Sequence, residues 1–178
     1  MMNKLDDFSA AQPIFVDANI LTYFALNTEP FQASCTAFLY GVEQGQIAAI
    51  TSAAALNEAF YAILVGKAAA ELQSTKIKQI HRQLMQDKDL ARACYEVCRQ
   101  FADYLQGLMQ AGLQMLPLDY QTQVAALDLG AQYQLLPTDA VHVATCQRYE
   151  IDHIATADTH FERVSFLQVW GPDNSLTL

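Results

Sequence analysis

The sequence predicts an α/β fold: a central, mostly parallel sheet with helices on both faces. Short apolar runs rich in β-branched residues alternate along the chain with longer segments of helical spacing. The 178 residues are 52% hydrophobic and 16% charged, which is typical of a globular protein rather than a disordered one. Repeats, low-complexity tracts and linkers rich in proline or glycine are missing, so we expect one domain over residues 1–178.

Five apolar runs are the candidate strands. Each is short, and longer segments with helical spacing lie between them. The runs are residues 14–16, 47–50, 115–116, 153–155 and 166–169. We therefore expect about five parallel strands between two layers of helices.

Residues 52–65, between the second and third candidate strands, read as a helix that is apolar nearly all round. Its one acid, Glu58, has only alanines and Tyr61 as neighbours three or four positions away. Burying an isolated carboxylate is costly unless it is paired or binds a metal. We expect Glu58 to be buried at a site, the alternative being a partly exposed residue at a helix edge.

Residues 66–112 read as helices only and hold most of the positive charge. Seven of the ten Lys and Arg residues lie within residues 67–99, against four of the 19 acids, in a chain whose net charge is −9. Lys78 and Arg82 lie opposite an apolar stripe that includes Ile80. These two side chains are candidate phosphate contacts. The alternative is an ordinary solvated helix face.

Residues 137–146 read as another helix. Pro137 suits the approach to it, Thr138 can cap it, and Asp139 then falls in the first turn, where the helix dipole favours a carboxylate. The helix dipole alone can explain why an acid occupies this position, so Asp139 need not have a function.

Two further acids, Asp17 and Asp158, follow the candidate strands at residues 14–16 and 153–155. In an open parallel sheet, ligands bind in the crevice at the carboxyl ends of the strands, so both acids can reach one site. Each could instead be a simple helix cap. If Asp17, Glu58, Asp139 and Asp158 do meet, either their pKa values rise or cations bind. Oxygen-only ligands favour Mg²⁺ or Mn²⁺ over zinc, and such ions support hydrolysis of phosphodiesters.

Several classes of protein are disfavoured. The negative net charge argues against a protein that coats nucleic acid or anionic membranes by bulk electrostatics. The acidic start of the chain lacks the apolar region of a signal peptide, and no apolar run is long enough to span a membrane, so we expect a cytoplasmic protein. The four cysteines lack zinc-site spacing, and we expect buried thiols.

Four motifs together resemble the PIN-domain family, in particular its VapC-type toxins. They are Val-Asp-Ala-Asn at residues 16–19, Glu58 on the second helix, Pro-Thr-Asp-Ala at residues 137–140 and Thr-Ala-Asp at residues 156–158. Each motif is short, but their order and strand context make the combination specific, and the resemblance covers roughly residues 14–169.

The resemblance implies a PIN-like three-layer α/β/α fold and an endoribonuclease site that depends on Mg²⁺ or Mn²⁺. Asp17, Glu58, Asp139 and Asp158 would then hold the metal, directly or through water, and Asn19 and Thr156 would orient them. It also implies RNA as substrate, a cognate antitoxin as partner in a type II toxin-antitoxin pair, and a homodimer.

Two features depart from this family pattern, and two other functions were considered. His160 stands near the position where many members have another acid, which leaves one or two metal ions open, and the helical segment at residues 66–112 is long for a compact toxin. A nuclease-like fold that is inactive and serves as a binding or regulatory module is the alternative. A phosphatase with Asp17 as nucleophile is disfavoured, because Asn19 replaces the second aspartate of the usual Asp-x-Asp pattern.

Overall fold

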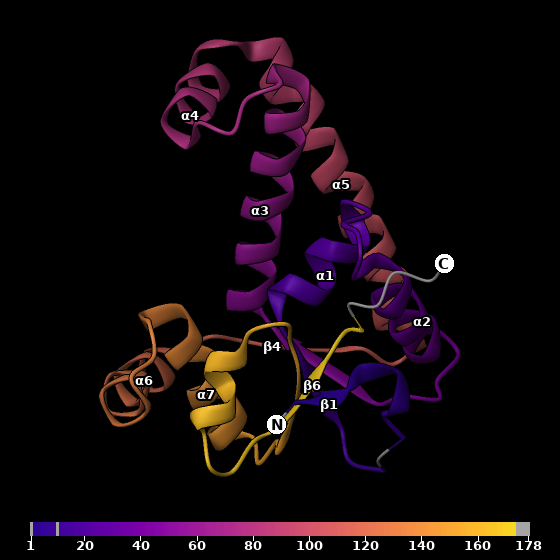
Figure 1. Ribbon diagram of the computed structural model, residues 1–178, viewed down its shortest axis with the longest axis vertical. Coiled ribbons are helices and arrows are strands. Elements are labelled where there is room, and N and C mark those ends of the chain that lie inside the picture. Colours follow the sequence, from indigo (N-terminus) through magenta and orange to yellow (C-terminus); the bar gives the residue numbers. More distant parts are fainter. Residues whose placement is uncertain (1, 10, 174–178) are drawn as a thin grey trace.

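The computed structural model describes residues 2–9 and 11–173, and within them it has six strands and seven α-helices (Figure 1). All strands run parallel in one sheet, in the order β1-β6-β5-β2-β3-β4. Their bounds are β1 (Asn3–Lys4), β2 (Ile14–Val16), β3 (Ala49–Ser52), β4 (Gln114–Leu116), β5 (His153–Ala155) and β6 (Gln168–Gly171). The predicted α/β class and parallel sheet are confirmed.

The five predicted strands all occur in the sheet. β2 and β5 have the predicted bounds, whereas β3 and β6 begin two residues later than expected and β4 one residue earlier. The sixth strand, β1, was not predicted, because Asn3 and Lys4 are exposed and carry no apolar signal. Asn3 pairs with Trp170 of β6 at the edge of the sheet. The central strands β2, β3 and β5 are buried along their whole length, as expected for strands covered on both faces.

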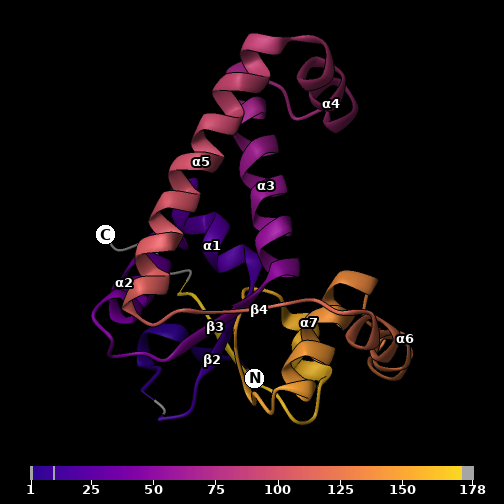
Figure 2. The ribbon, with the colours of Figure 1, turned by 180° about the vertical axis from the view of Figure 1, so that it is seen from behind.

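Helices cover both faces of this sheet (Figures 1 and 2). On one side lie α1 (Ala18–Ala25) and α2 (Gln32–Glu43), and on the other lie α6 (Tyr120–Tyr133) and α7 (Pro137–Arg148). Two short 3-10 helices, η1 (Leu5–Asp7) and η2 (Thr159–Arg163), complete the layers. The strands and these helices share one large hydrophobic core, which has fully buried residues such as Phe15, Leu39 and Ile154 at its centre.

A helical arm projects from the sheet. It consists of α3 (Ala53–Leu72), α4 (Ile77–Gln86) and α5 (Lys88–Ala111), which confirms that residues 66–112 form helices only. Figures 1 and 2 show α3 and α5 rising side by side, with α4 packed at their far end. Ser52 and Asp87 cap α3 and α5 by accepting hydrogen bonds from the first-turn amides. A small second core around Ala68, Ile80 and Cys94 holds the tip together.

The start of α7 differs from expectation in one detail. Leu136 is the residue before the helix and Pro137 is its first residue, so Thr138 lies inside the first turn and does not cap it. Proline suits this first position because its missing amide hydrogen would have no partner there. Asp139 still falls in the first turn, as predicted.

The described helices include none that is both long and apolar enough to cross a membrane. The longest apolar candidate, α3, carries Glu58, Lys67 and Glu71. All four cysteines are unpaired and buried, which confirms the expectation of packed thiols.

The sheet order sets the position of the site. β2 pairs with β3 on one side and with β5 on the other. The connection that follows β2 therefore leads to one side of it, and a later connection brings the chain back to the other side. Crevices at such points are the usual ligand sites of open parallel sheets. The carboxyl ends of β2, β3 and β5 lead directly to Asp17, to α3 with Glu58, and to Asp158.

Candidate active site

Asp17 sits at the carboxyl end of β2 and caps α1. Its backbone amide donates to the carbonyl of Ala155 at 3.0 Å, which ties the end of β2 to β5. The carboxylate is only 7% exposed. Its Oδ1 accepts from the amide of Ala18 at 2.6 Å, while Oδ2 accepts from the Thr156 hydroxyl at 2.5 Å and the Asn19 amide at 2.6 Å. Asp17 is therefore held rigidly in one orientation.

Asn19 and Thr156 join the two strand ends. The Asn19 Nδ2 also donates to Thr156 Oγ1 at 2.9 Å, and its Oδ1 accepts from the amide of Ala157 at 3.0 Å. Thr156, which is fully buried, accepts from the amide of Asp158 at 3.0 Å. These bonds place Asn19 and Thr156 between Asp17 and Asp158, where polar supports for the acids were expected.

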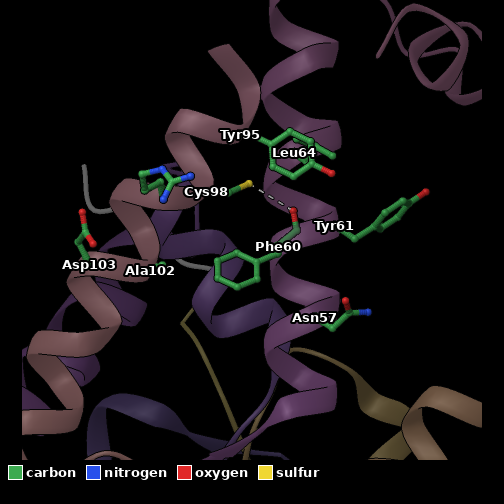
Figure 3. Close-up of a pocket in the computed structure, with 9 residues that line it drawn as sticks. Asn57, Phe60, Tyr61, Leu64, Tyr95, Cys98, Ala102 and Asp103 are labelled. Atoms are coloured by element: carbon green, nitrogen blue, oxygen red, sulfur yellow. Dashed lines mark hydrogen bonds between the residues drawn. The ribbon is translucent and has the colours of Figure 1, made fainter. Parts of the chain in front are cut away.

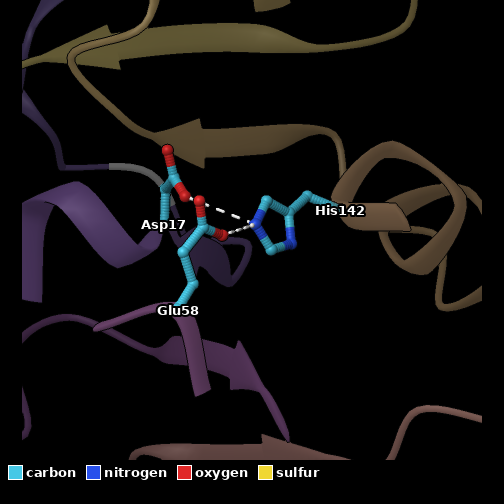
Figure 4. Close-up of side chains that lie close together, drawn as sticks. All are labelled: Asp17, Glu58 and His142. Atoms are coloured by element: carbon cyan, nitrogen blue, oxygen red, sulfur yellow. Dashed lines mark hydrogen bonds and ion pairs between the residues drawn. The ribbon is translucent and has the colours of Figure 1, made fainter. Parts of the chain in front are cut away.

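Glu58 reaches the site from α3 and meets a histidine from α7. His142 Nε2 lies 3.1 Å from Glu58 Oε2 and 3.6 Å from Asp17 Oδ1 (Figure 4). The imidazole is 1% exposed and packs against the ring of Phe15, 5.5 Å away between centroids. The Glu58 side chain is 41% exposed, so the expectation that it is buried was wrong. α3 leaves the carboxyl end of β3 as part of the arm, and its first turns therefore stay open to solvent on one side.

Asp139 and Asp158 form a second group together with His160. Each of these three residues offers a ligand atom within 4.8 Å of the other two. Asp158 caps η2 by accepting from the His160 amide at 2.8 Å, and the His160 Nδ1 lies 3.1 Å from the same oxygen. Asp17, Glu58 and His142 form the first group, and their ligand atoms also lie within 4.8 Å of one another.

Charges in each of the two groups shift pKa values in the other. Burial raises the pKa of Asp17, an effect that His142 and the Thr156 hydrogen bond oppose. Burial also raises the pKa of Asp139, and the charges of Asp158, Asp17 and Glu58 add to this effect. Burial alone would lower the pKa of His142, but the hydrogen bond to Glu58 and the charge of Asp17 outweigh it and raise the pKa. Asp139 thus interacts electrostatically with each of the other three predicted acids.

The donor atoms fit a divalent cation. Each group offers two carboxylates and one imidazole nitrogen, and crowded carboxylates of raised pKa are stabilised by positive charge. Both Mg²⁺ and Mn²⁺ favour carboxylate oxygens, which each group supplies in a pair. The geometry of both groups is compatible with a bound divalent cation.

Lys78 and Arg82 lie elsewhere. Both are exposed on α4, at the far end of the arm, where they line a hollow of about 460 Å³ together with Lys76. The structure therefore does not bring them into the acidic site itself.

Comparison with known proteins decides the family. A family model described as PIN domain matches residues 14–167, a span that includes all four acids and strands β2 to β5. The chain belongs to the PIN-domain family. The resemblance expected from the motifs is confirmed.

Two curated relatives of this PIN domain come from Methanocaldococcus jannaschii. Ribonuclease VapC2 is 25% identical over 156 residues, which cover 88% of this chain and 91% of that protein. Ribonuclease VapC6 is 37% identical over 57 residues, which cover 32% of this chain and only 37% of that protein. The crystal structure of VapBC2 from Rickettsia felis, bound to a DNA fragment from their promoter, contains a similar chain. The TM-score is 0.51 and the identity 16%, over 91% of this chain and 100% of that one, which shows a shared fold.

Neither His142 nor His160 was predicted as a site residue from the sequence of this PIN domain. His142 stands among Ala140, Val143 and Ala144, and a histidine in such a helix is usually a packing residue. One signal could have found it: His142 follows Asp139 by three positions and so lies on the same helix face. His160 is likewise two positions from Asp158.

Proposed function

We propose that this PIN domain is an endoribonuclease that hydrolyses RNA phosphodiester bonds with the help of Mg²⁺ or Mn²⁺. The observation that carries the proposal is the convergence of Asp17, Glu58, Asp139 and Asp158 at the carboxyl ends of the central strands, in two groups that each fit a cation. The relatives named as ribonucleases support it. The four acids are the proposed metal ligands.

The protein's own side chains have distinct tasks in this proposal. A bound divalent cation would polarise the scissile phosphate and activate a water as nucleophile. Asp17 contributes a rigid carboxylate, because three donors fix it. His142 positions Glu58 through its Nε2, and Thr156 couples Asp17 to the backbone of Asp158. Asp139, from the first turn of α7, faces Asp158 across the crevice.

The test is cleavage of a mixed RNA pool during titration with Mg²⁺ or Mn²⁺. We expect EDTA to abolish cutting by the wild type, and Asp17→Asn and Asp139→Asn to cut at least about 100-fold more slowly, because each removes a ligand charge. Asp103→Asn is a matched control, since Asp103 is exposed on α5 outside both groups. Full activity of the two site variants would overturn the assignment.

A second candidate is an inactive PIN domain that serves as a binding or regulatory module. One observation favours it: His142 already places a basic group against Glu58 and Asp17, so the acids have a partner without a metal. A wild type that neither cuts RNA nor gains thermal stability from Mn²⁺ would favour this module. A phosphatase with Asp17 as nucleophile fits poorly, because that carboxylate is almost fully buried.

We further propose an antitoxin partner, in a cytoplasmic toxin-antitoxin pair. A solved structure with a similar chain is that of a VapBC2 complex. The candidate surface is a hollow of about 620 Å³ between α3 and α5, which includes Phe60, Leu64 and the exposed Tyr95 (Figure 3). Co-expression with the product of a small neighbouring gene, followed by co-purification, tests the partnership. Tyr95→Asp should weaken it, while Tyr40→Asp on α2 should not.

A homodimer is also part of the proposal. Four apolar side chains on α6 and the loop after it are exposed: Tyr120 at 80%, Val124 at 43%, Leu127 at 70% and Leu136 at 70%. The first three repeat at helical spacing and so share one face. Light scattering after gel filtration should give twice the chain mass for the wild type and the single chain mass for Leu127→Asp with Leu136→Asp.

A further inference from the structure

A pocket opens directly beside the acids. It has a volume of about 670 Å³, within the usual range of small-ligand sites, and Glu58 is part of its wall. It lies where the first turns of α3 face α6 and α7 (Figure 1). Most of the lining is apolar, contributed by Ala53, Ala54, Leu118, Pro137 and Val141. The amides of Asn57 and Gln123 and the hydroxyl of Thr138 add hydrogen-bonding groups.

Tyr61 forms the rim of this pocket one helical turn beyond Glu58. It is 51% exposed, yet its position is fixed, because its hydroxyl lies 3.0 Å from His81 Nε2 and the two rings meet edge to face at 5.9 Å. Figure 3 shows Tyr61 and Asn57 pointing from α3 away from α5. An exposed aromatic ring held by a neighbour is a ready stacking surface for a base.

His81 comes from α4, so it connects Tyr61 to the basic end of the arm. α4 carries Lys78 and Arg82 and contains no acid, in a chain whose net charge is −9. Positive side chains beyond the pocket can contact phosphates that the carboxylate site would repel. Along α3, the acidic site at Glu58 is thus followed by the pocket, then by Tyr61, and finally by α4 at the far end.

We propose that this pocket binds the base of a nucleotide next to the scissile phosphate of single-stranded RNA, with Tyr61 as its stacking partner. The inference rests on the proposed ribonuclease function and extends it to substrate recognition. His81 is a positioning residue that holds Tyr61, and Asn57 and Gln123 read the edge of the base. Lys78 and Arg82 contact phosphates further along the strand. The substrate is single-stranded because a base can enter a pocket only when it is unpaired and unstacked.

Binding and cleavage are measured separately, so that the two proposals can fail independently. Fluorescence anisotropy with a labelled random-sequence 12-mer RNA reports binding in the Asp139→Asn background, where cleavage is not required. We expect Tyr61→Ala to weaken binding about 5- to 100-fold, the usual effect of losing one stacked base. Tyr61→Phe should weaken binding less than Tyr61→Ala and no more than His81→Ala, because it keeps the ring and loses only the hydroxyl contact with His81. Tyr40→Ala is the matched control, because Tyr40 is 59% exposed on α2 and lines no part of the pocket.

A direct spectroscopic signal tests the stacking itself. The chain contains one tryptophan, Trp170, so Tyr61→Trp adds a single new fluorophore. We expect RNA to quench the emission of Tyr61→Trp and to leave that of the wild type unchanged. For His81, a double-mutant cycle is decisive: His81→Ala should weaken binding by itself but have no further effect in the Tyr61→Ala variant.

Salt dependence separates the basic residues from the pocket. Lys78→Ala with Arg82→Ala should reduce the slope of log affinity against log salt by about 0.7 for each lost contact, whereas Tyr61→Ala should leave the slope unchanged. Lys4→Ala is the charge control, because Lys4 is exposed on β1 at the far edge of the sheet and lines neither the pocket nor the hollow on α4. Unchanged RNA affinity in Tyr61→Ala, or no quenching in Tyr61→Trp, would overturn the proposal even if the wild type cuts RNA. If the pocket instead binds a segment of a partner protein, Tyr61→Ala would leave the RNA affinity unchanged and RNA would not quench Tyr61→Trp.

Discussion

The Nε2 atom of His142 lies 3.1 Å from Oε2 of Glu58, although the two residues are 84 positions apart in the chain. Figure 4 shows that the same nitrogen also faces Asp17. His142 thereby fixes the direction of a carboxylate that is otherwise open to solvent.

Replacing His142 by phenylalanine should lower the affinity for Mn²⁺ about 10- to 100-fold, the usual effect of removing a group that orients a metal ligand. Phenylalanine keeps the ring packing against Phe15. Isothermal titration calorimetry measures the affinity. His153→Phe is the control: His153 is also buried, but its partners are Trp170 and Asp152, which belong to neither acidic group. Tighter Mn²⁺ binding in His142→Phe would mean that His142 competes with the cation.

Thr156→Val should destabilise the protein by about 1.5–3 kcal/mol, because the buried hydroxyl donates to a carboxylate and its loss leaves Asp17 short of a donor. Valine has nearly the same shape, so packing is preserved. The measurement is urea denaturation followed by circular dichroism. Thr145→Val should cost much less, since the equally buried Thr145 hydroxyl bonds only to the Val141 carbonyl of its own helix. Equal losses would contradict a special role for Thr156.

Asp139→Asn should stabilise the protein when no metal is present. Burial, with the charge of Asp158, raises the pKa of Asp139 above its ordinary value of 3.8, so the folded state holds this proton more tightly than the unfolded chain. Such a group contributes stability below its unfolded pKa, and the contribution is lost as pH rises through the folded pKa. At pH 7.5 in EDTA the variant should gain ~1 kcal/mol, or about 2–4 °C in Tm.

The pH dependence checks the sign of this effect. The difference in Tm between Asp139→Asn and the wild type should shrink as pH falls and vanish below the ordinary carboxyl pKa of 3.8, where the Asp139 carboxyl is protonated in both the folded and the unfolded wild type. Differential scanning fluorimetry across this range measures it. A difference that stays constant down to pH 4 would show that charge repulsion is not the cause.

The four thiols should resist modification in the native protein. Burial raises the pKa of Cys35 to about 12 and that of Cys146 further still, and neither side chain is exposed. Because only the thiolate reacts, 5,5′-dithiobis(2-nitrobenzoate) at pH 7.5 should titrate none of the four without denaturant and all of them in guanidinium chloride. Rapid reaction of Cys146 would show that the core around α7 opens readily.

Much of the fold could be predicted, because it depends on local patterns. Short apolar runs predicted β2 to β6, and helical spacing predicted the arm. Asp17 and Asp158 could be placed because parallel strands bring their carboxyl ends to one edge of a sheet. Strand β1 could not, since its pairing with β6 joins the two ends of the described chain and leaves no mark on two polar residues.

The site was harder to predict where it depends on contacts distant in sequence. Nothing around His142 indicates that Glu58 will reach it from another helix. The exposure of Glu58 also follows from tertiary structure: a helix that is apolar all round would be buried if it lay on the sheet, but α3 stands away from it as an arm. The pocket at Tyr61 arises only from the way α3 meets α6 and α7.

The tip of the arm is stabilised by a core of its own, in which only Ala68, Ile80 and Cys94 are fully buried. So few contacts make this end the least costly part of the arm to unfold locally, while the sheet keeps its own, larger core. Hydrogen exchange should therefore be faster in α4 than in β2 or α7. Excursions of this kind would release Tyr61 from His81 without disturbing the four acids, so the proposed base pocket would open while the proposed metal site stays folded.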